Sequence, residues 1–80
     1  MSLIRTEAAP FGTLVLPVYN AEGFLEATLR DVHDWLARRE EAWELIVIDD
    51  ASRDASPRIL DAFSRDHAGE SIQVLRFDAN

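Results

Sequence analysis

The chain has 80 residues, of which 48% are hydrophobic and 29% are charged, and its formal net charge is −7. This length allows one small domain at most, and the composition is that of a globular rather than a disordered chain. The acidic balance and the scattered basic residues argue against nucleic-acid binding. The lack of cysteine excludes disulfides and cysteine-based metal sites. Because no apolar run reaches transmembrane length and no signal-peptide pattern opens the chain, a cytoplasmic location is the default expectation.

The N-terminal part of the chain predicts a strand followed by a helix. Residues 1–12 are interpreted as a leader, and the domain is expected over residues 13–80. Residues 13–18 form an apolar run typical of a buried strand. From Asn20 the pattern changes to that of an amphipathic helix, with Asn20 as its N-cap and Glu22 near the positive end of the helix dipole. The apolar stripe of this helix consists of Leu25, Leu29, Val32 and Leu36.

The rest of the chain repeats this alternation. Residues 45–48 form a second apolar run, which ends in two adjacent aspartates. Ser56 followed by Pro57 is a helix start signal, with serine as the N-cap and proline at the first helical position. This second helix is expected to end at residues 67–69, and an apolar run from Ile72 then opens a third strand.

Strand, helix, strand, helix and strand in this order predict an α/β fold with a parallel sheet and right-handed crossovers. The expected architecture is the βαβαβ half of a doubly wound, Rossmann-like sheet. The last apolar run is followed by no helix that would cover the sheet, so the chain is expected to be a truncated domain.

The acidic pair Asp49 and Asp50 follows the second predicted strand, where ligands of open α/β sheets bind. Neighbouring residues of an extended chain point to opposite sides, so we expect one of the two aspartates to meet the ligand and the other to support the turn. An ionised carboxylate accepts hydrogen bonds, which suits ribose hydroxyls or the N–H of a nucleobase. A purely structural interpretation, in which both aspartates serve the turn, is about equally supported by the pair alone.

The first predicted strand ends in Pro17 and Tyr19, which would lie at the same edge of the sheet. Each has a structural explanation, since proline marks an exit from a sheet and tyrosine packs readily against a core. Together with the acidic turn, however, the tyrosine ring is better explained as a surface on which a nucleobase stacks.

Other kinds of site find less support in the sequence. There is no glycine-rich dinucleotide fingerprint, no phosphate loop with lysine and no nucleophile elbow. His33 and His67 are expected on the two helices without partners at metal-ligand spacing, as surface or boundary residues. Arg53 is expected to form an ion pair with Asp50 or Asp54 in preference to binding a phosphate.

Two segments together resemble the opening of family 2 glycosyltransferases. The first reads Leu-Val-Leu-Pro-Val-Tyr-Asn-Ala-Glu over residues 14–22, and the second reads Glu-Leu-Ile-Val-Ile-Asp-Asp-Ala-Ser-Arg-Asp over residues 44–54. The family has Pro-x-Tyr-Asn-x-Glu after its first strand and Asp-Asp-Gly-Ser-x-Asp after its second. The resemblance runs from about residue 13 to the end of the chain. The sequence of the first segment is also similar to that of the corresponding segment in dolichol-phosphate-mannose synthases.

The resemblance implies that the chain is the N-terminal, nucleotide-sugar-binding part of a GT-A domain. By analogy Pro17 and Tyr19 line the base pocket, Glu22 lies near the nucleotide and Asp50 hydrogen-bonds the base. Asp49 belongs to the same nucleotide site and secures the turn. Alanine at position 51 replaces the commoner glycine of the turn, which restricts positive φ at that position.

The resemblance also implies chemistry that these residues do not carry. The parent protein would transfer a sugar from a UDP- or GDP-sugar with inversion, using Mn²⁺ or Mg²⁺ held mostly by ligands outside this chain. The chain itself is expected to contain no catalytic residue and no metal site, and to be inactive alone because nothing in it neutralises the leaving diphosphate. Any membrane contact would come through parts of the parent outside the chain.

Two other hypotheses stay open at this point. The chain could be a non-catalytic α/β module that forms a homodimer through its open sheet edge. A receiver-like signalling domain also places acids at strand ends, but it expects an acidic pair after the first strand, where this chain has Pro-Val-Tyr.

Overall fold

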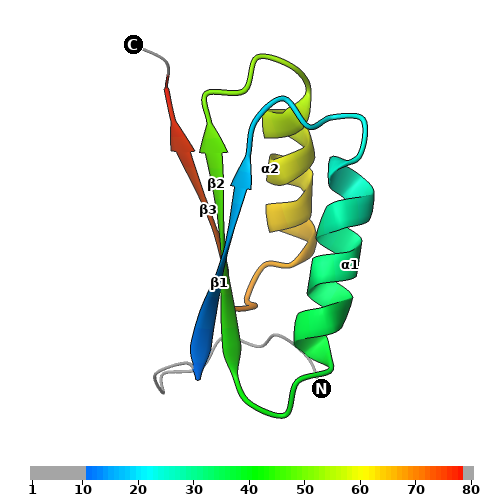
Figure 1. Cartoon of the computed structure of the whole chain (residues 1–80), viewed down its shortest axis with the longest axis vertical. Helices are drawn as coiled ribbons and strands as arrows, with labels where there is room; N and C mark the ends of the chain where they lie inside the picture. The colour runs from blue at the N-terminus through cyan, green and yellow to red at the C-terminus, as the bar shows by residue number, and fades with distance from the viewer. Residues whose placement is uncertain (1–10, 79–80) are drawn as a thin grey trace.

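The computed structural model describes residues 11–78, which form five elements in the order β1, α1, β2, α2 and β3 (Figure 1). Residues 1–10 of the predicted leader lie outside the described residues. The elements are β1 (Gly12–Val18), α1 (Leu25–Ala37), β2 (Trp43–Asp50), α2 (Ser56–Asp66) and β3 (Ile72–Phe77). This alternation confirms the predicted α/β fold. Neither described helix is long and apolar enough to cross a membrane.

The three strands form one parallel sheet in the order β1-β2-β3, with β2 in the centre. The register pairs Val18 of β1 with Asp49 of β2, and Asp49 with Arg76 of β3. All three carboxyl ends therefore lie at the same edge of the sheet. Both helices lie on one face of the sheet and run antiparallel to the strands, as βαβ connections require (Figure 1).

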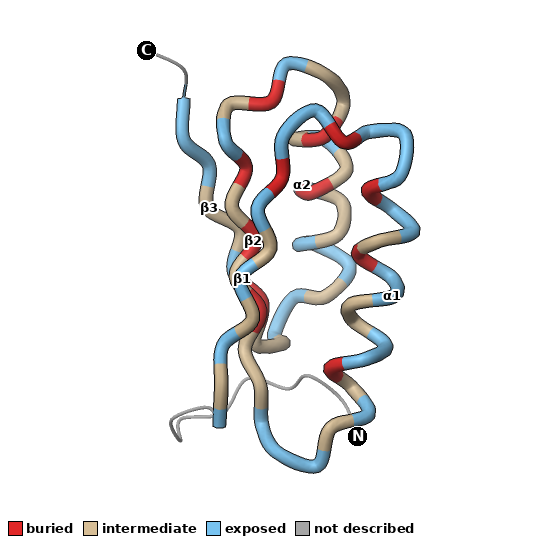
Figure 2. Tube along the Cα trace, viewed as in Figure 1, coloured by how far each residue is buried: buried red, intermediate tan, exposed pale blue. Residues whose placement is uncertain are grey.

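The apolar core lies between the sheet and the two helices. Figure 2 marks the buried positions on the strands, the helices and the loops that join them. Because side chains alternate along a strand, the residues on either side of each buried strand position point to the opposite face of the sheet. No described helix covers that face, and Val15 there is 50% exposed. The buried apolar residues are Val18, Ala21, Leu25, Leu29, Leu36, Leu45, Val47, Leu60 and Ile72.

Both helices differ from the prediction at their N-termini. The first begins at Leu25 rather than next to Asn20, because Asn20 adopts a left-handed φ of 46° and belongs to the loop after β1. Ser56 is the first residue of α2 and not its N-cap, and no side chain caps this helix from the N-cap position, Ala55. The predicted C-terminus is confirmed, since α2 ends at Asp66 with His67 as its C-cap.

Candidate functional site

Two loops meet at the carboxyl edge of the sheet, one after β1 and one after β2. Tyr19 opens the first loop and is 62% exposed, and Asp50, also exposed, ends β2. Pro17 is exposed near the end of β1, on the face of the sheet that the helices leave open. The structure thus brings an exposed aromatic ring, a proline and a free carboxylate to one edge, on neighbouring strands.

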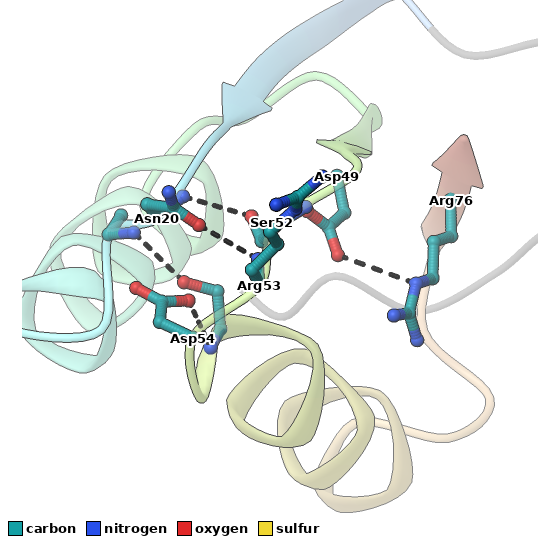
Figure 3. Close-up of polar contacts among 8 residues, drawn as sticks. Asn20, Asp49, Ser52, Arg53, Asp54 and Arg76 are labelled. Atoms are coloured by element: carbon teal, nitrogen blue, oxygen red, sulfur yellow. Dashed lines mark hydrogen bonds and ion pairs between the residues drawn. The ribbon is translucent and has the colours of Figure 1, made fainter. Parts of the chain in front are cut away.

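Asp49 has a different environment from Asp50, because adjacent strand residues point to opposite faces. The Asp49 side chain is 1% exposed, and its Oδ1 accepts a hydrogen bond of 3.1 Å from the backbone N–H of Ser52. Its Oδ2 lies 3.8 Å from Arg76 Nε, an ion-pair distance, and has no hydrogen bond within the described residues (Figure 3). Asp49 therefore holds the turn after β2, whereas the Asp50 side chain is exposed at the surface.

The turn after β2 uses a backbone conformation that usually belongs to glycine. Ala51 has φ 60°, in the left-handed region that costs a residue with a Cβ about 1–2 kcal/mol. The alanine was expected to disfavour positive φ at this position, yet the chain keeps that conformation. The hydrogen bond from Ser52 to Asp49 closes the turn around Ala51 and offsets part of this strain.

The loops after β1 and β2 are joined by hydrogen bonds, and we call residues 20–22 and 52–56 together the loop clamp (Figure 3). The backbone N–H of Asn20 donates to Ser52 Oγ at 2.9 Å, and the Asn20 side-chain oxygen accepts from the N–H of Arg53 at 2.8 Å. The N–H of Ala21 donates to Ser56 Oγ at 2.9 Å. Segments more than 30 residues apart in the chain are thus joined into one unit. Tyr19 and Asp50 immediately precede the two loops that form it.

Glu22 lies in the loop clamp, where it contacts the start of α2. Its N–H donates to Asp54 Oδ2 at 3.1 Å, and its own carboxylate accepts from the N–H of Ala55 at 3.3 Å. Asp54 Oδ1 also accepts from the N–H of Ser56 at 2.8 Å. Desolvation acts to raise the pKa of Asp54, but the hydrogen bonds from Ser56 and Glu22 hold that pKa below its usual value.

The ion pair predicted for Arg53 is not formed within residues 11–78. Asp54 is engaged by backbone N–H groups instead, and Asp50 forms no ion pair in the same region. Arg53 enters the loop clamp through its backbone N–H, which donates to Asn20. Its guanidinium is exposed at the carboxyl edge of the sheet.

Ser52 and Ser56 are the site residues that the sequence reasoning missed. Both are buried, 5% and 0% exposed, and both hydroxyls accept backbone N–H groups of the other loop. The sequence predicts Ser56 as the cap of its own helix instead. For Ser52 the available signal is the Asp-Asp-x-Ser-x-Asp pattern, whose serine and last aspartate both form hydrogen bonds within the loop clamp.

The carboxylates of Asp49 and Asp50 lie on opposite faces of the sheet and do not point to one position. One carboxylate is buried against Ser52 and Arg76, and the other points to the opposite face of the sheet. A cation of the Mg²⁺ or Mn²⁺ type needs several oxygen ligands converging on one point. No group of potential metal ligands is found at this edge within the described part of the chain.

His33 and His67 are not the unpartnered residues that the sequence predicted. Their rings lie 4.2 Å apart between centroids, and both contact the carboxylate of Glu70. These three residues lie near the amino end of the sheet, away from the loop clamp, because Glu70 is two residues before the start of β3.

Comparisons with known proteins place the chain among sugar-transferring enzymes. The model of the family described as glycosyl transferase family 2 matches residues 13–80. The minor teichoic acid biosynthesis protein GgaA of Bacillus subtilis is 37% identical over 66 residues, which are 82% of this chain and 15% of that protein. The putative teichuronic acid biosynthesis glycosyltransferase TuaG of the same organism is 32% identical over 75 residues, 94% of this chain and 28% of that protein.

A third curated relative is the undecaprenyl-phosphate 4-deoxy-4-formamido-L-arabinose transferase of Pseudomonas fluorescens, 38% identical over 65 residues, or 81% of this chain and 19% of that protein. The chain therefore spans between 15% and 28% of the length of these relatives. No solved structure matches the chain significantly.

Proposed function

Because the chain belongs to glycosyl transferase family 2, we propose that it supplies the nucleotide-binding part of a nucleotide-sugar site. The observation that carries this proposal is the pairing of exposed Tyr19 with exposed Asp50 at the carboxyl edge of the sheet. A parallel sheet binds its ligands at this edge. The boundary follows the family match, with residues 13–80 as the nucleotide-sugar-binding part.

Each residue of the proposed site has its own role. The base stacks on the ring of Tyr19 beside Pro17, and the Asp50 carboxylate accepts an N–H of the base. Glu22 lies near the nucleotide and holds the loop after β1 against α2 through Ala55. Asp49 acts on the nucleotide site through the turn that it holds, since its side chain is buried.

The whole protein would transfer the sugar of a UDP- or GDP-sugar with inversion, with Mn²⁺ or Mg²⁺ bound largely by residues outside this chain. We propose no catalytic residue within the chain and expect it to be inactive alone. The relative named for undecaprenyl phosphate supports a lipid-phosphate acceptor for the whole protein. We propose in addition that the whole protein acts at the cytoplasmic face of a membrane.

Titration of the ¹⁵N-labelled chain with UDP and with GDP tests the nucleotide site by NMR. We expect chemical-shift changes centred on Tyr19 and Asp50.

Replacing Tyr19→Ala should weaken nucleotide binding roughly 5-fold or more, because one base stack is lost, whereas Tyr19→Phe should keep most of the affinity. Asp50→Asn should weaken binding, and Asp31→Asn, an exposed aspartate of α1, serves as its matched control. Shifts centred elsewhere, or equal affinity of Tyr19→Ala and wild type, would disprove the proposal.

One observation favours the alternative of a dimerising module. The sheet face opposite the helices exposes Val15, and Phe77 on the edge strand β3 is 54% exposed. An open edge strand with exposed apolar side chains can pair with the edge strand of a second copy of the chain. Sedimentation that shows a stable dimer, together with no NMR response to either nucleotide, would support this alternative over the nucleotide site.

A further inference from the structure

The chain has two histidines and no cysteine, and folding brings both histidines to one carboxylate. His33 Nε2 lies 2.7 Å from Glu70 Oε1, and His67 Nδ1 lies 2.8 Å from Glu70 Oε2. We call His33, His67 and Glu70 the histidine cluster. Within residues 11–78 it is the one group of histidines and acids whose geometry could hold a metal ion.

Three different elements position the histidine cluster. His33 lies on α1, His67 caps the C-terminus of α2, and Glu70 follows in the connection to β3. The N–H of Glu70 donates to the carbonyl of His67 at 3.1 Å, which closes a tight turn. Gly69 has φ +90° at the third position of this turn, where a positive φ requires glycine. The turn thus fixes two potential ligands relative to each other before any ion binds.

The surroundings of the cluster favour a cation. Phe63 packs against both imidazoles, with its ring centroid 4.5 Å from that of His67 and 6.4 Å from that of His33. The two histidines line one end of a groove of about 410 Å³ between α1 and α2. The charged residues of this groove are Glu26, Arg30, Asp34 and Asp66, three acids against one base. A half-buried site with an apolar wall and an acidic rim strengthens the attraction of a positive ion.

We infer that His33, His67 and Glu70 form a binding site for a divalent transition metal, with Zn²⁺ as the best match. The three ligand atoms lie within 4.8 Å of one another. Ligands of a tetrahedral Zn²⁺ bound at about 2.0–2.2 Å lie roughly 3.4 Å apart, so small side-chain rotations suffice. Two imidazoles and one carboxylate are a recognised zinc ligand set that leaves a fourth position open, here toward the groove between the helices.

Metal binding replaces the hydrogen bonds that the cluster makes in its absence. Because a carboxylate only accepts, His33 Nε2 and His67 Nδ1 now carry the protons directed at Glu70. Coordination requires these nitrogens to present lone pairs, so each proton moves to the other ring nitrogen or to solvent. The two carboxylate oxygens of Glu70 already lie 2.7 and 2.8 Å from these nitrogens, so the three ligands meet one ion without a large rearrangement.

The test uses the whole 80-residue chain, freed of metal with a chelator, and Zn²⁺ itself as the probe. Titration against a competing chromophoric chelator should show one tight equivalent of Zn²⁺. His67→Ala should weaken binding at least ~10-fold, since loss of a ligand costs no less than loss of its supporting contacts. Asp31→Asn, an exposed acid of α1, and Asp50→Asn at the opposite edge of the sheet should leave the zinc affinity unchanged.

A second measurement does not depend on any variant. In the wild-type chain the ring resonances of both histidines should shift together at one equivalent of Zn²⁺, and zinc should raise the melting temperature because it binds the folded state. An equal concentration of Mg²⁺ should do neither. An unchanged zinc affinity in His67→Ala, or histidine resonances that do not shift when zinc is added, would overturn the assignment. The histidine cluster would then be only a hydrogen-bonded contact between α1 and the α2–β3 turn.

Discussion

The backbone N–H of Asn20, in the loop after β1, donates a 2.9 Å hydrogen bond to the hydroxyl of Ser52, in the loop after β2. Ser52 in turn donates its own N–H to Asp49, so the buried aspartate, the serine and the first loop form one chain of contacts. Tyr19 immediately precedes Asn20, and Asp50 immediately follows Asp49. Tyr19 and Asp50 are the residues proposed to bind the nucleotide, and their relative position therefore depends on the hydrogen bond to the Ser52 hydroxyl.

Ser52→Ala should destabilise the chain by about 1–2 kcal/mol. The substitution leaves the N–H of Asn20 without its part-buried partner, and an unsatisfied buried donor costs about 1–3 kcal/mol. Urea denaturation followed by circular dichroism measures the change. Ser64→Ala, at an exposed position of α2, is the matched control and should be neutral or slightly stabilising. Equal stabilities of the two variants would show that the loop clamp contributes nothing.

The order of strands and helices was predictable from the sequence, because the period of the apolar residues changes between strands and helices. The different environments of Asp49 and Asp50 were predictable for the same reason, since strand side chains alternate. What the sequence could not show was contact between distant segments. The link between Asn20 and Ser52 and that between His33 and Glu70 span more than 30 residues, and no local pattern records them.

The start of α1 was misplaced because an asparagine before an apolar stripe is a good N-cap signal. In the folded chain the Asn20 side chain accepts from Arg53 instead, and its positive φ prevents a helix from starting there. Tertiary contact thus outweighed local preference at the residue next to the proposed site. The same is true of Ser56, whose hydroxyl binds the first loop rather than its own helix.

Ala51→Gly should stabilise the chain by about 0.5–1 kcal/mol. Glycine removes the left-handed strain of about 1–2 kcal/mol at φ 60°, and part of this gain is lost to the greater freedom of glycine in the unfolded chain. Thermal and urea denaturation measure the difference. Ala62→Gly, inside α2, should do the opposite and lose about 1 kcal/mol. A loss of stability with Ala51→Gly would mean that the turn does not carry this strain.

The stability contributed by Glu70 should depend on pH. Its pKa in the folded chain lies below the usual value of 4.5, so the folded state favours the charged carboxylate. This contribution is fully present above the unfolded-state pKa and is lost as the pH falls through the lower, folded-state value. In metal-free buffer the stability difference between wild type and Glu70→Gln should therefore shrink as the pH falls from about 5 toward about 3. A difference that grows over this range would contradict the lowered pKa.

Gly12→Ala should destabilise the chain by about 1–3 kcal/mol, the usual cost of overpacking. A Cβ at Gly12 would lie 2.6 Å from Cζ3 and 2.8 Å from Cη2 of Trp43. The indole cannot move aside freely, because Phe11 packs against it with ring centroids 5.6 Å apart and Trp35 with centroids 6.0 Å apart. Urea denaturation with tryptophan fluorescence follows both the stability and the environment of the indole.

Gly23→Ala is the matched control, since a Cβ at Gly23 meets no atom within 4 Å. It should be neutral or stabilise by about 0.4–1 kcal/mol, because alanine restricts the unfolded chain. If Gly12→Ala were as stable as Gly23→Ala, the contact between β1 and Trp43 would not be a packing constraint.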